Sequence, residues 1–148
     1  MSLYDISATG LSVFIKASVS FPNGFVAEGL ADDTDPLAFA EMTVAEADTN
    51  INRDLVVWGK PQAMTPTIAA ISGSQLDENL QVMLEASENG VRETVELTVT
   101  YPDGSSVTAG DGVITTGTKG KSVTSAGRTA TRTYGFAFGT HTENNAPR

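Results

Sequence analysis

Few side chains in this sequence are of a type that could perform catalysis. The one histidine, His141, lies in a polar stretch near the C-terminus, where a general base is rarely found. Two glutamate pairs, Glu41 with Glu46 and Glu93 with Glu96, could serve a hydrolase, but nothing in the sequence places either pair across a cleft. The sequence contains no cysteine, so it offers no thiolate nucleophile. We therefore expect a protein that is not an enzyme and that carries no cofactor.

Three aspartates, Asp32, Asp33 and Asp35, form the most acidic short segment, within residues 31–36. Closely spaced carboxylates can supply oxygen ligands to calcium. The segment lacks the glycine and the glutamate that an EF-hand loop carries at fixed positions, so we expect no metal site here. The better interpretation is an exposed acidic loop that faces solvent or another protein chain.

The sequence carries one basic segment, which contains Lys119, Lys121, Arg128 and Arg132. It could grip phosphate groups. The chain as a whole has nine basic and eighteen acidic residues and a formal charge of −9, which argues against wrapping nucleic acid. These cations are therefore interpreted as partners for acidic loops of a neighbouring copy, with unrelated surface charges as the alternative.

The length of 148 residues predicts a single domain over 1–148. We expect residues 1–10 to form an N-terminal arm and residues 140–148 a flexible tail. No apolar run is long enough to span a membrane. The first ten residues lack the features of a signal peptide, so we expect synthesis and initial retention in a cytoplasm.

One segment, from Ser74 to Gly90, predicts an α-helix at about residues 75–89. Ser74 is a suitable N-cap with Asp77 three residues later, and Gly90 suits a left-handed residue after the helix end. An apolar stripe with helical spacing runs along it, formed by Leu76, Leu80, Met83 and Leu84. The acidic side chains, Asp77 among them, are expected on the rest of the helix surface.

Most of the remaining sequence alternates as β-strands do. The predicted strands are 11–20, 25–30, 37–47, 55–58, 64–72, 91–101, 107–116 and 128–138, with a poor helix as the alternative for 37–47. Pro22-Asn23-Gly24 predicts a hairpin turn, and Gly110-Asp111-Gly112 predicts a bulge or a kink. Residues 55–58 are expected to be a buried strand with Trp58 in the core. The fold class is mainly β: an antiparallel β-sandwich or partial barrel with one flanking α-helix.

Several local motifs follow one another in a characteristic order. They are Phe21-Pro-Asn-Gly-Phe25, Ala31-Asp-Asp-Thr-Asp-Pro36, Ile51-Asn-Arg-Asp-Leu55 before Trp58, Gly73-Ser74 before Asp77, Asn79 and Leu80, Tyr101-Pro-Asp-Gly104, Gly112-Val-Ile-Thr115, Ser125-Ala-Gly-Arg128 and Thr133-Tyr134-Gly-Phe136. With these motifs in this order, the chain resembles the tail tube proteins of contractile-tailed bacteriophages over roughly residues 11–138.

The resemblance implies a structural virion protein that forms stacked rings of six copies, with strands joining neighbours into a closed tube wall. The acidic hollow channel would pass phage DNA into the host cell. Implied partners are further copies, the tail sheath, baseplate or initiator and tail terminator proteins, and, transiently in the lumen, the tape-measure protein and DNA. The resemblance places the protein in the virion tail, assembled in the bacterial host cytoplasm. Related tubes occur in R-type bacteriocins and type VI secretion.

Two sets of residues are predicted to serve this assembly. Candidates for the lumen wall are polar residues of strands whose other face is apolar: Glu41, Thr43, Thr94, Glu96 and Thr98. Candidates for contacts between subunits or rings are charged residues of loops: Asp32, Asp33, Asp35, Asp48, Arg53, Lys119, Lys121 and Arg128. A non-enzymatic β-sandwich that binds sugar or peptide remains the alternative, although only Phe14 is a clear outward-facing aromatic residue.

Overall fold

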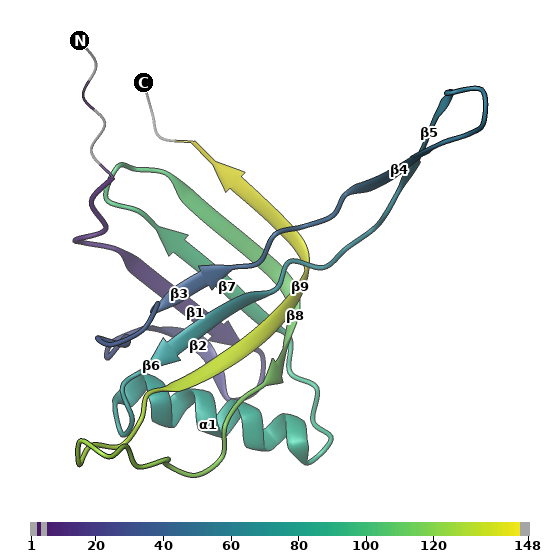
Figure 1. The fold of residues 1–148 in the computed structure, drawn as a ribbon. Coiled ribbons are helices and arrows are strands. Elements are labelled where there is room, and N and C mark those ends of the chain that lie inside the picture. The colour runs from purple at the N-terminus through teal and green to yellow at the C-terminus, as the bar shows by residue number, and fades with distance from the viewer. Residues whose placement is uncertain (1–2, 4–5, 146–148) are drawn as a thin grey trace.

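The computed structural model describes residue 3 and residues 6–145 (Figure 1). Seven antiparallel strands form one sheet in the order β2-β1-β7-β8-β9-β6-β3, and β4 and β5 form a separate two-stranded sheet. One helix, α1, follows β6. The elements are β1 Ser12–Ala17, β2 Phe21–Val26, β3 Leu37–Phe39, β4 Ala45–Thr49, β5 Leu55–Gly59, β6 Pro66–Ala70, α1 Gln75–Glu88, β7 Val95–Thr100, β8 Ser106–Thr116 and β9 Arg132–Asn144. The mainly β class with one flanking helix is confirmed.

The large sheet folds over on itself because its two longest strands each serve two layers (Figure 1). The first half of β8 pairs with β7, and its second half pairs only with β9. The predicted bulge lies at this transition: one additional residue of β8 faces β7 between Ala109 and Gly112, and Asp111 has a φ of 51°. The result is the partial barrel that the alternation predicted.

The core fills the space between the layers, and α1 lies across one end of it (Figure 1). Alternation in β1 and β7 is confirmed, since the alternate apolar residues of both strands are buried. Their cross-strand pairs, such as Ile15 with Leu97, carry the apolar surface from strand to strand. The largest buried side chains are Tyr134, Phe136, Phe138, Ile15, Ile68, Leu76, Leu80, Met83 and Leu97.

Helix α1 begins and ends as its sequence predicts. The Ser74 hydroxyl accepts a hydrogen bond from the Asp77 N–H at 3.2 Å, and Gly90 follows the helix with a φ of 91°. One expectation was wrong: the Asp77 side chain is fully buried instead of solvated. It faces Arg132 across the core, an arrangement that no local pattern in α1 encodes.

The β4–β5 hairpin extends away from the large sheet (Figure 1), which corrects two predictions. The predicted strand 37–47 is two strands, β3 and β4, separated by residues 40–44. The predicted buried strand 55–58 is β5, whose residues are all exposed, and Trp58 is 46% exposed instead of lying in the core. An apolar run predicts an apolar neighbour, but no other element in the described part of the chain covers the hairpin.

Two further predictions differ from the structure at strand ends. Pro22-Asn23-Gly24 lies inside β2 instead of forming the turn, which is made by residues 18–20. The β1–β2 register shift accommodates it, and Gly24, with a φ of 75°, is needed because a Cβ there would meet the Phe14 ring. The expected flexible tail 140–148 is β-strand through Asn144, paired with β8; residues 146–148 lie outside the described residues. The division into a single domain with an N-terminal arm stays a prediction.

Candidate assembly surfaces

The outward face of the β1–β7–β8–β9 layer is polar and rich in threonine. Register places Lys16 beside Glu96, and Thr98 beside Thr108, which in turn lies beside Thr142. A shallow depression of about 260 Å³ lies on this face between β7, β8 and β9. We call this surface the threonine face. Small hydroxyl side chains fit the pleated surface and leave it smooth and hydrated.

Three of the predicted lumen residues lie on or beside the threonine face. Glu96 and Thr98 belong to β7, and Thr94 directly precedes that strand on the same face. Glu41 and Thr43 lie elsewhere, in residues 40–44 at the base of the hairpin, where the Thr43 N–H donates to Gln62 Oε1 at 2.6 Å. The structure thus brings together only part of the predicted set, and a lumen position for any of these residues stays a prediction.

The acidic loop and the basic segment contact each other within one chain. Arg128 pairs with Asp32 at 3.1 Å, and the Thr131 hydroxyl donates to Asp33 at 3.1 Å. The hydrogen bond from Arg128 lowers the pKa of Asp32. Asp35 is exposed in the same loop. Asp32, Asp33 and Arg128, which the sequence predicted to contact a neighbouring copy, therefore already have partners within their own chain.

Two further cations of the predicted contact set lie in the same basic segment. Lys119 pairs with Glu88 of α1 at 3.0 Å, and this hydrogen bond raises the pKa of Lys119. Lys121 is exposed, and among the described residues it forms no ion pair. Contacts of all these side chains with another copy stay predictions.

The hairpin carries the largest group of exposed apolar side chains. Register places Val57 beside Ala47 and Leu55 beside Thr49, so one face of the hairpin has no charged side chain. Leu55 is 65% and Val57 57% exposed. We call this surface the hairpin apolar face. Asp48 lies on the opposite face and Arg53 in the turn, so both predicted contact residues belong to this projection.

Sequence reasoning missed the hairpin because its apolar run was interpreted as core. The available signal was the composition of the partner strand, Ala45–Thr49, which carries Glu46 and Asp48 and no large apolar residue. Lys60 pairs with Glu46 at 3.4 Å at the base of the hairpin. A strand pair with one charged face and one uncharged face is typical of a surface that is half covered by a partner.

Two strand edges of the threonine-face layer lack a partner among the described residues. β2 is the terminal strand of the sheet, and Pro22 within it lacks an N–H, as edge strands tolerate. The C-terminal half of β9, residues 139–144, pairs with β8 on one side and with no strand on the other, since β6 pairs only as far as Gly135. Unpaired edges favour pairing with another chain.

A buried ionic network joins α1 to β9 and to the basic segment. The Asp77 carboxylate accepts hydrogen bonds from both the Nε and the Nη2 of Arg132, from the Tyr134 hydroxyl at 2.7 Å and from the Gly73 N–H at 2.9 Å. Burial opposes ionisation of Asp77, but these donors outweigh it and lower its pKa. Burial, followed by the bond to Asp77, raises the pKa of Tyr134 to about 12. The Gln81 side-chain amide donates to the Tyr134 hydroxyl at 2.6 Å and to the Thr118 carbonyl at 2.8 Å, and so connects the network to the basic segment.

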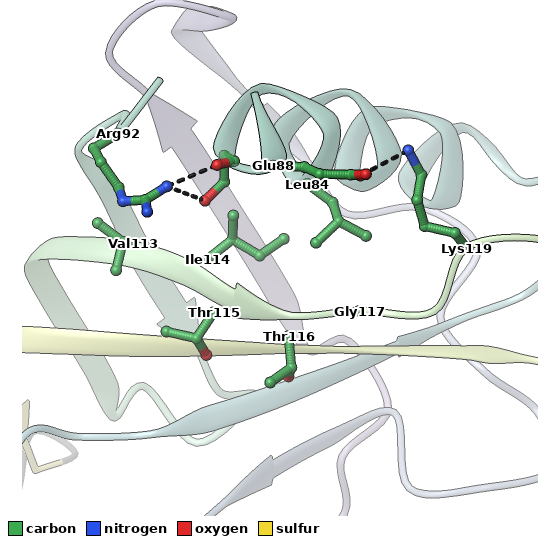
Figure 2. A pocket seen from close by; sticks show the side chains of 10 residues that line it. Leu84, Glu88, Arg92, Val113, Ile114, Thr115, Thr116, Gly117 and Lys119 are labelled. Carbon is green, nitrogen blue, oxygen red and sulfur yellow. Dashed lines mark hydrogen bonds and ion pairs between the residues drawn. The ribbon is translucent and has the colours of Figure 1, made fainter. Parts of the chain in front are cut away.

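A groove of about 830 Å³ separates the C-terminal half of α1 from the end of β8 (Figure 2). Leu84 and Ile114 form its apolar floor. Arg92 lies at one end, where its Nη1 donates to the Ser87 carbonyl at 2.7 Å, and Lys119 lies at the other. We call it the α1–β8 groove. Among the described residues, no helix is long and apolar enough to cross a membrane.

Comparison with protein families gives a match over nearly the whole chain. The family model for tail fiber protein gp32 matches residues 4–142. The chain belongs to the tail fiber protein gp32 family. A tail-related structural role follows from that membership. No curated protein sequence matches the chain.

Solved structures share this fold at low sequence identity. A chain of the anti-feeding prophage (AFP) baseplate matches with a TM-score of 0.64 and 9% identity, covering 100% of both chains. The sheath/tube terminator of PVC, an extracellular contractile injection system, matches at 0.62 and 9%, covering 98% of this chain and 100% of that one. The AFP tube-terminating cap matches at 0.52 and 15%, covering 99% and 95%. The fold expected from the resemblance to contractile tail tubes is thereby confirmed.

Proposed function

We propose that the chain is a ring-forming subunit of a contractile tail, with six copies per ring and rings stacked into a hollow tube. The observation that carries this proposal is the pair of free strand edges, β2 and residues 139–144 of β9, on either side of the threonine face. Joining these edges between copies would continue one sheet around a ring and cover both of these edges.

The topology specifies how such a junction would be built. β2 and β7 are both antiparallel to β1, while β7 and β9 are both antiparallel to β8. β2 and β9 therefore run in the same direction. Cyclic symmetry preserves direction from copy to copy, so the junction between neighbouring copies would be a parallel strand pair in an otherwise antiparallel wall.

The threonine face would then form the channel wall, with Thr94, Glu96 and Thr98 in the lumen. Each copy has a formal charge of −9, so a ring of six carries −54. Screening limits the reach of this charge to about 8 Å at physiological salt, which is sufficient when a duplex nearly fills the bore. On the threonine face the register sets Lys16 beside Glu96, so the wall carries no excess of cations that would bind phosphate, and DNA could pass without adhering.

The hairpin supplies the contact between rings in this proposal. Its apolar face would be covered by a copy in the next ring, with Asp48, Arg53 and the loop charges at the rim of that contact. The implied partners are further copies, the tail sheath, baseplate or initiator and tail terminator proteins, and the tape-measure protein and DNA in transit. The particle would be assembled in the host cytoplasm. A bacteriocin or secretion tube would use the same subunit surfaces with another cargo.

Negative-stain electron microscopy at high protein concentration, with sedimentation velocity at low concentration, tests this proposal. Hollow tubes with an open bore are expected. Leu55→Asp together with Val57→Asp should give single rings without stacks, whereas Val82→Asp, at a residue 49% exposed on α1, should leave tubes intact. A compact monomer at every concentration, also after addition of preformed tail ends, would refute the proposal and favour a non-enzymatic binding module.

A second candidate is a ring at one end of a tube. It is favoured by the whole-length likeness to chains described as a baseplate and as a sheath/tube terminator. Such a subunit would use the same strand edges to close a ring but would expose its hairpin to a different protein. Rings that never stack, for the unmodified chain at any concentration, would support this candidate over the tube.

A further inference from the structure

We propose that the α1–β8 groove binds the N-terminal segment of a second copy, residues 3–7, as an added β-strand. This inference rests on the proposed self-assembly and names a contact within it. It concerns the surface around α1, which neither the threonine face nor the hairpin includes.

The groove contains a free backbone edge. β7 pairs with β8 only as far as Val95 with Gly112, so residues 113–116 of β8 have no partner on that side among the described residues. The chain before β7 turns toward the β1–β2 turn instead, where the Ser18 N–H donates to the Thr94 carbonyl at 3.0 Å. The edge of β8 is therefore left open beside α1.

The lining of the groove shows that this edge faces the cavity. Five consecutive residues, 113–117, line it. Side chains alternate between the two faces of a strand, so five successive residues can share one cavity only where the backbone edge runs along it. At the far end, Gly117 approaches so closely that a Cβ there would lie 2.7 Å from Leu84 Cδ2, which closes the groove. An extended segment of about five residues would therefore fit alongside β8.

The N-terminal segment has the properties of such a strand. Leu3 is 92% and Ile6 94% exposed, so the described residues leave both side chains almost uncovered. Within one copy, Ile6 lines a depression with Tyr101 and Pro102, which follow the end of β7 away from α1 (Figure 1). In a head-to-tail stack, the end of one copy that carries the N-terminal segment meets the end of the next copy that carries α1.

The chemistry of the two surfaces is complementary. The apolar floor of Leu84 and Ile114 suits a leucine or isoleucine side chain. Lys119 at one end of the groove pairs with Glu88, which also lines it. Arg92 at the other end forms no ion pair among the described residues, so it is the cation available to Asp5, the one charged residue in the sequence of the segment. Strand addition to an exposed edge uses main-chain hydrogen bonds for affinity and side-chain contacts for specificity.

Disulfide trapping tests the contact, because the natural sequence contains no cysteine. One preparation carries Val113→Cys; another carries either Leu3→Cys or Ile6→Cys, since these positions lie on opposite faces of a strand. The two preparations are mixed, assembled and oxidised, and denaturing electrophoresis detects a linked dimer. A disulfide requires Cα atoms within about 7 Å, so linkage reports direct apposition. We expect linkage with one of the two segment positions and its loss when Thr98→Cys replaces Val113→Cys.

The outcomes separate this inference from the proposed function. Tubes in the microscope without linkage at either segment position would overturn the inference and leave the tube intact. Linkage of Val113→Cys with Leu55→Cys instead would assign the groove to the hairpin and also overturn it. Linked dimers without rings or tubes would support the contact while refuting the tube, and a sample with neither assembly nor linkage would refute both.

Discussion

The buried Asp77–Arg132 pair makes the strongest prediction about stability. Asp77→Ala would remove the acceptor for the Arg132 guanidinium, whose side chain is only 8% exposed, and for the Tyr134 hydroxyl. The Gly73 N–H before α1 would lose its acceptor as well. Water cannot readily replace these contacts, because Asp77 itself is fully buried.

Leaving a buried charge without its partner costs about 3 to 5 kcal/mol of unfolding free energy. For a domain of this size, each kcal/mol lowers Tm by about 3 °C, so we expect a decrease of about 9 to 15 °C. The matched control is the double variant Asp77→Leu with Arg132→Met, which replaces both charges by apolar side chains. Its unfolding free energy should fall clearly less than that of Asp77→Ala alone, because it leaves no buried charge without a partner.

Urea unfolding followed by far-ultraviolet circular dichroism is the suitable assay. Fluorescence of Trp58 would report poorly on the core, because this residue lies in the exposed hairpin. Protein concentrations should be low enough to keep the chain monomeric, since assembly adds apparent stability. A loss below about 1 kcal/mol for Asp77→Ala, or a double variant as unstable as the single one, would refute this account of the network.

Three further predictions follow from local geometry. The pKa of Asp77 lies below its ordinary value of 3.8, so the Asp77–Arg132 pair should stabilise the fold fully above that pH and progressively less as pH falls below it. Acid unfolding curves should show this loss of stability in the natural chain and not in the double variant Asp77→Leu with Arg132→Met. Gly112→Ala should cost about 1 to 3 kcal/mol in urea unfolding, since a Cβ there would lie 2.2 Å from Phe138 Cδ1, whereas Gly59→Ala meets no atom within 4 Å and should be harmless. Val57→Trp combined with Trp58→Phe puts the one tryptophan on the hairpin apolar face, and its emission should shift to shorter wavelength when tubes form; an unchanged spectrum in assembled protein would contradict burial of that face by a neighbour.

Local sequence chemistry was a reliable guide where a segment is organised by its own residues. The N-cap at Ser74 and the left-handed residue Gly90 delimit α1 through bonds within a few residues. Alternation in β7 predicted which side chains are buried, because a strand with one apolar face must cover that face. The bulge near Gly112 was also predicted from local sequence. Its left-handed residue is Asp111, and Gly112 is needed there because a Cβ would meet the Phe138 ring.

Local patterns misled where the partner of a segment lies far away or outside the chain. The sequence around Asp77 predicts a solvated helix residue, but the fold brings Arg132, 55 positions later, into hydrogen-bond contact with it. Residues 140–144 are polar, yet they are strand because β8 offers them a long edge. Trp58 and Val57 have the composition of core, but the hairpin carries them beyond the sheet that would have covered them.

The sequence by itself determined the periods, caps and turns of this protein, and hence a mainly β domain with one helix and an acidic surface. It also carried the ordered motifs that resemble contractile tail tubes. Only the tertiary structure decided which strand edges stay open, which apolar faces lack cover and which charges are buried. The physical reason is that periodicity specifies that a side chain needs an apolar or paired neighbour, whereas the position of the whole segment in space decides whether the same chain provides one.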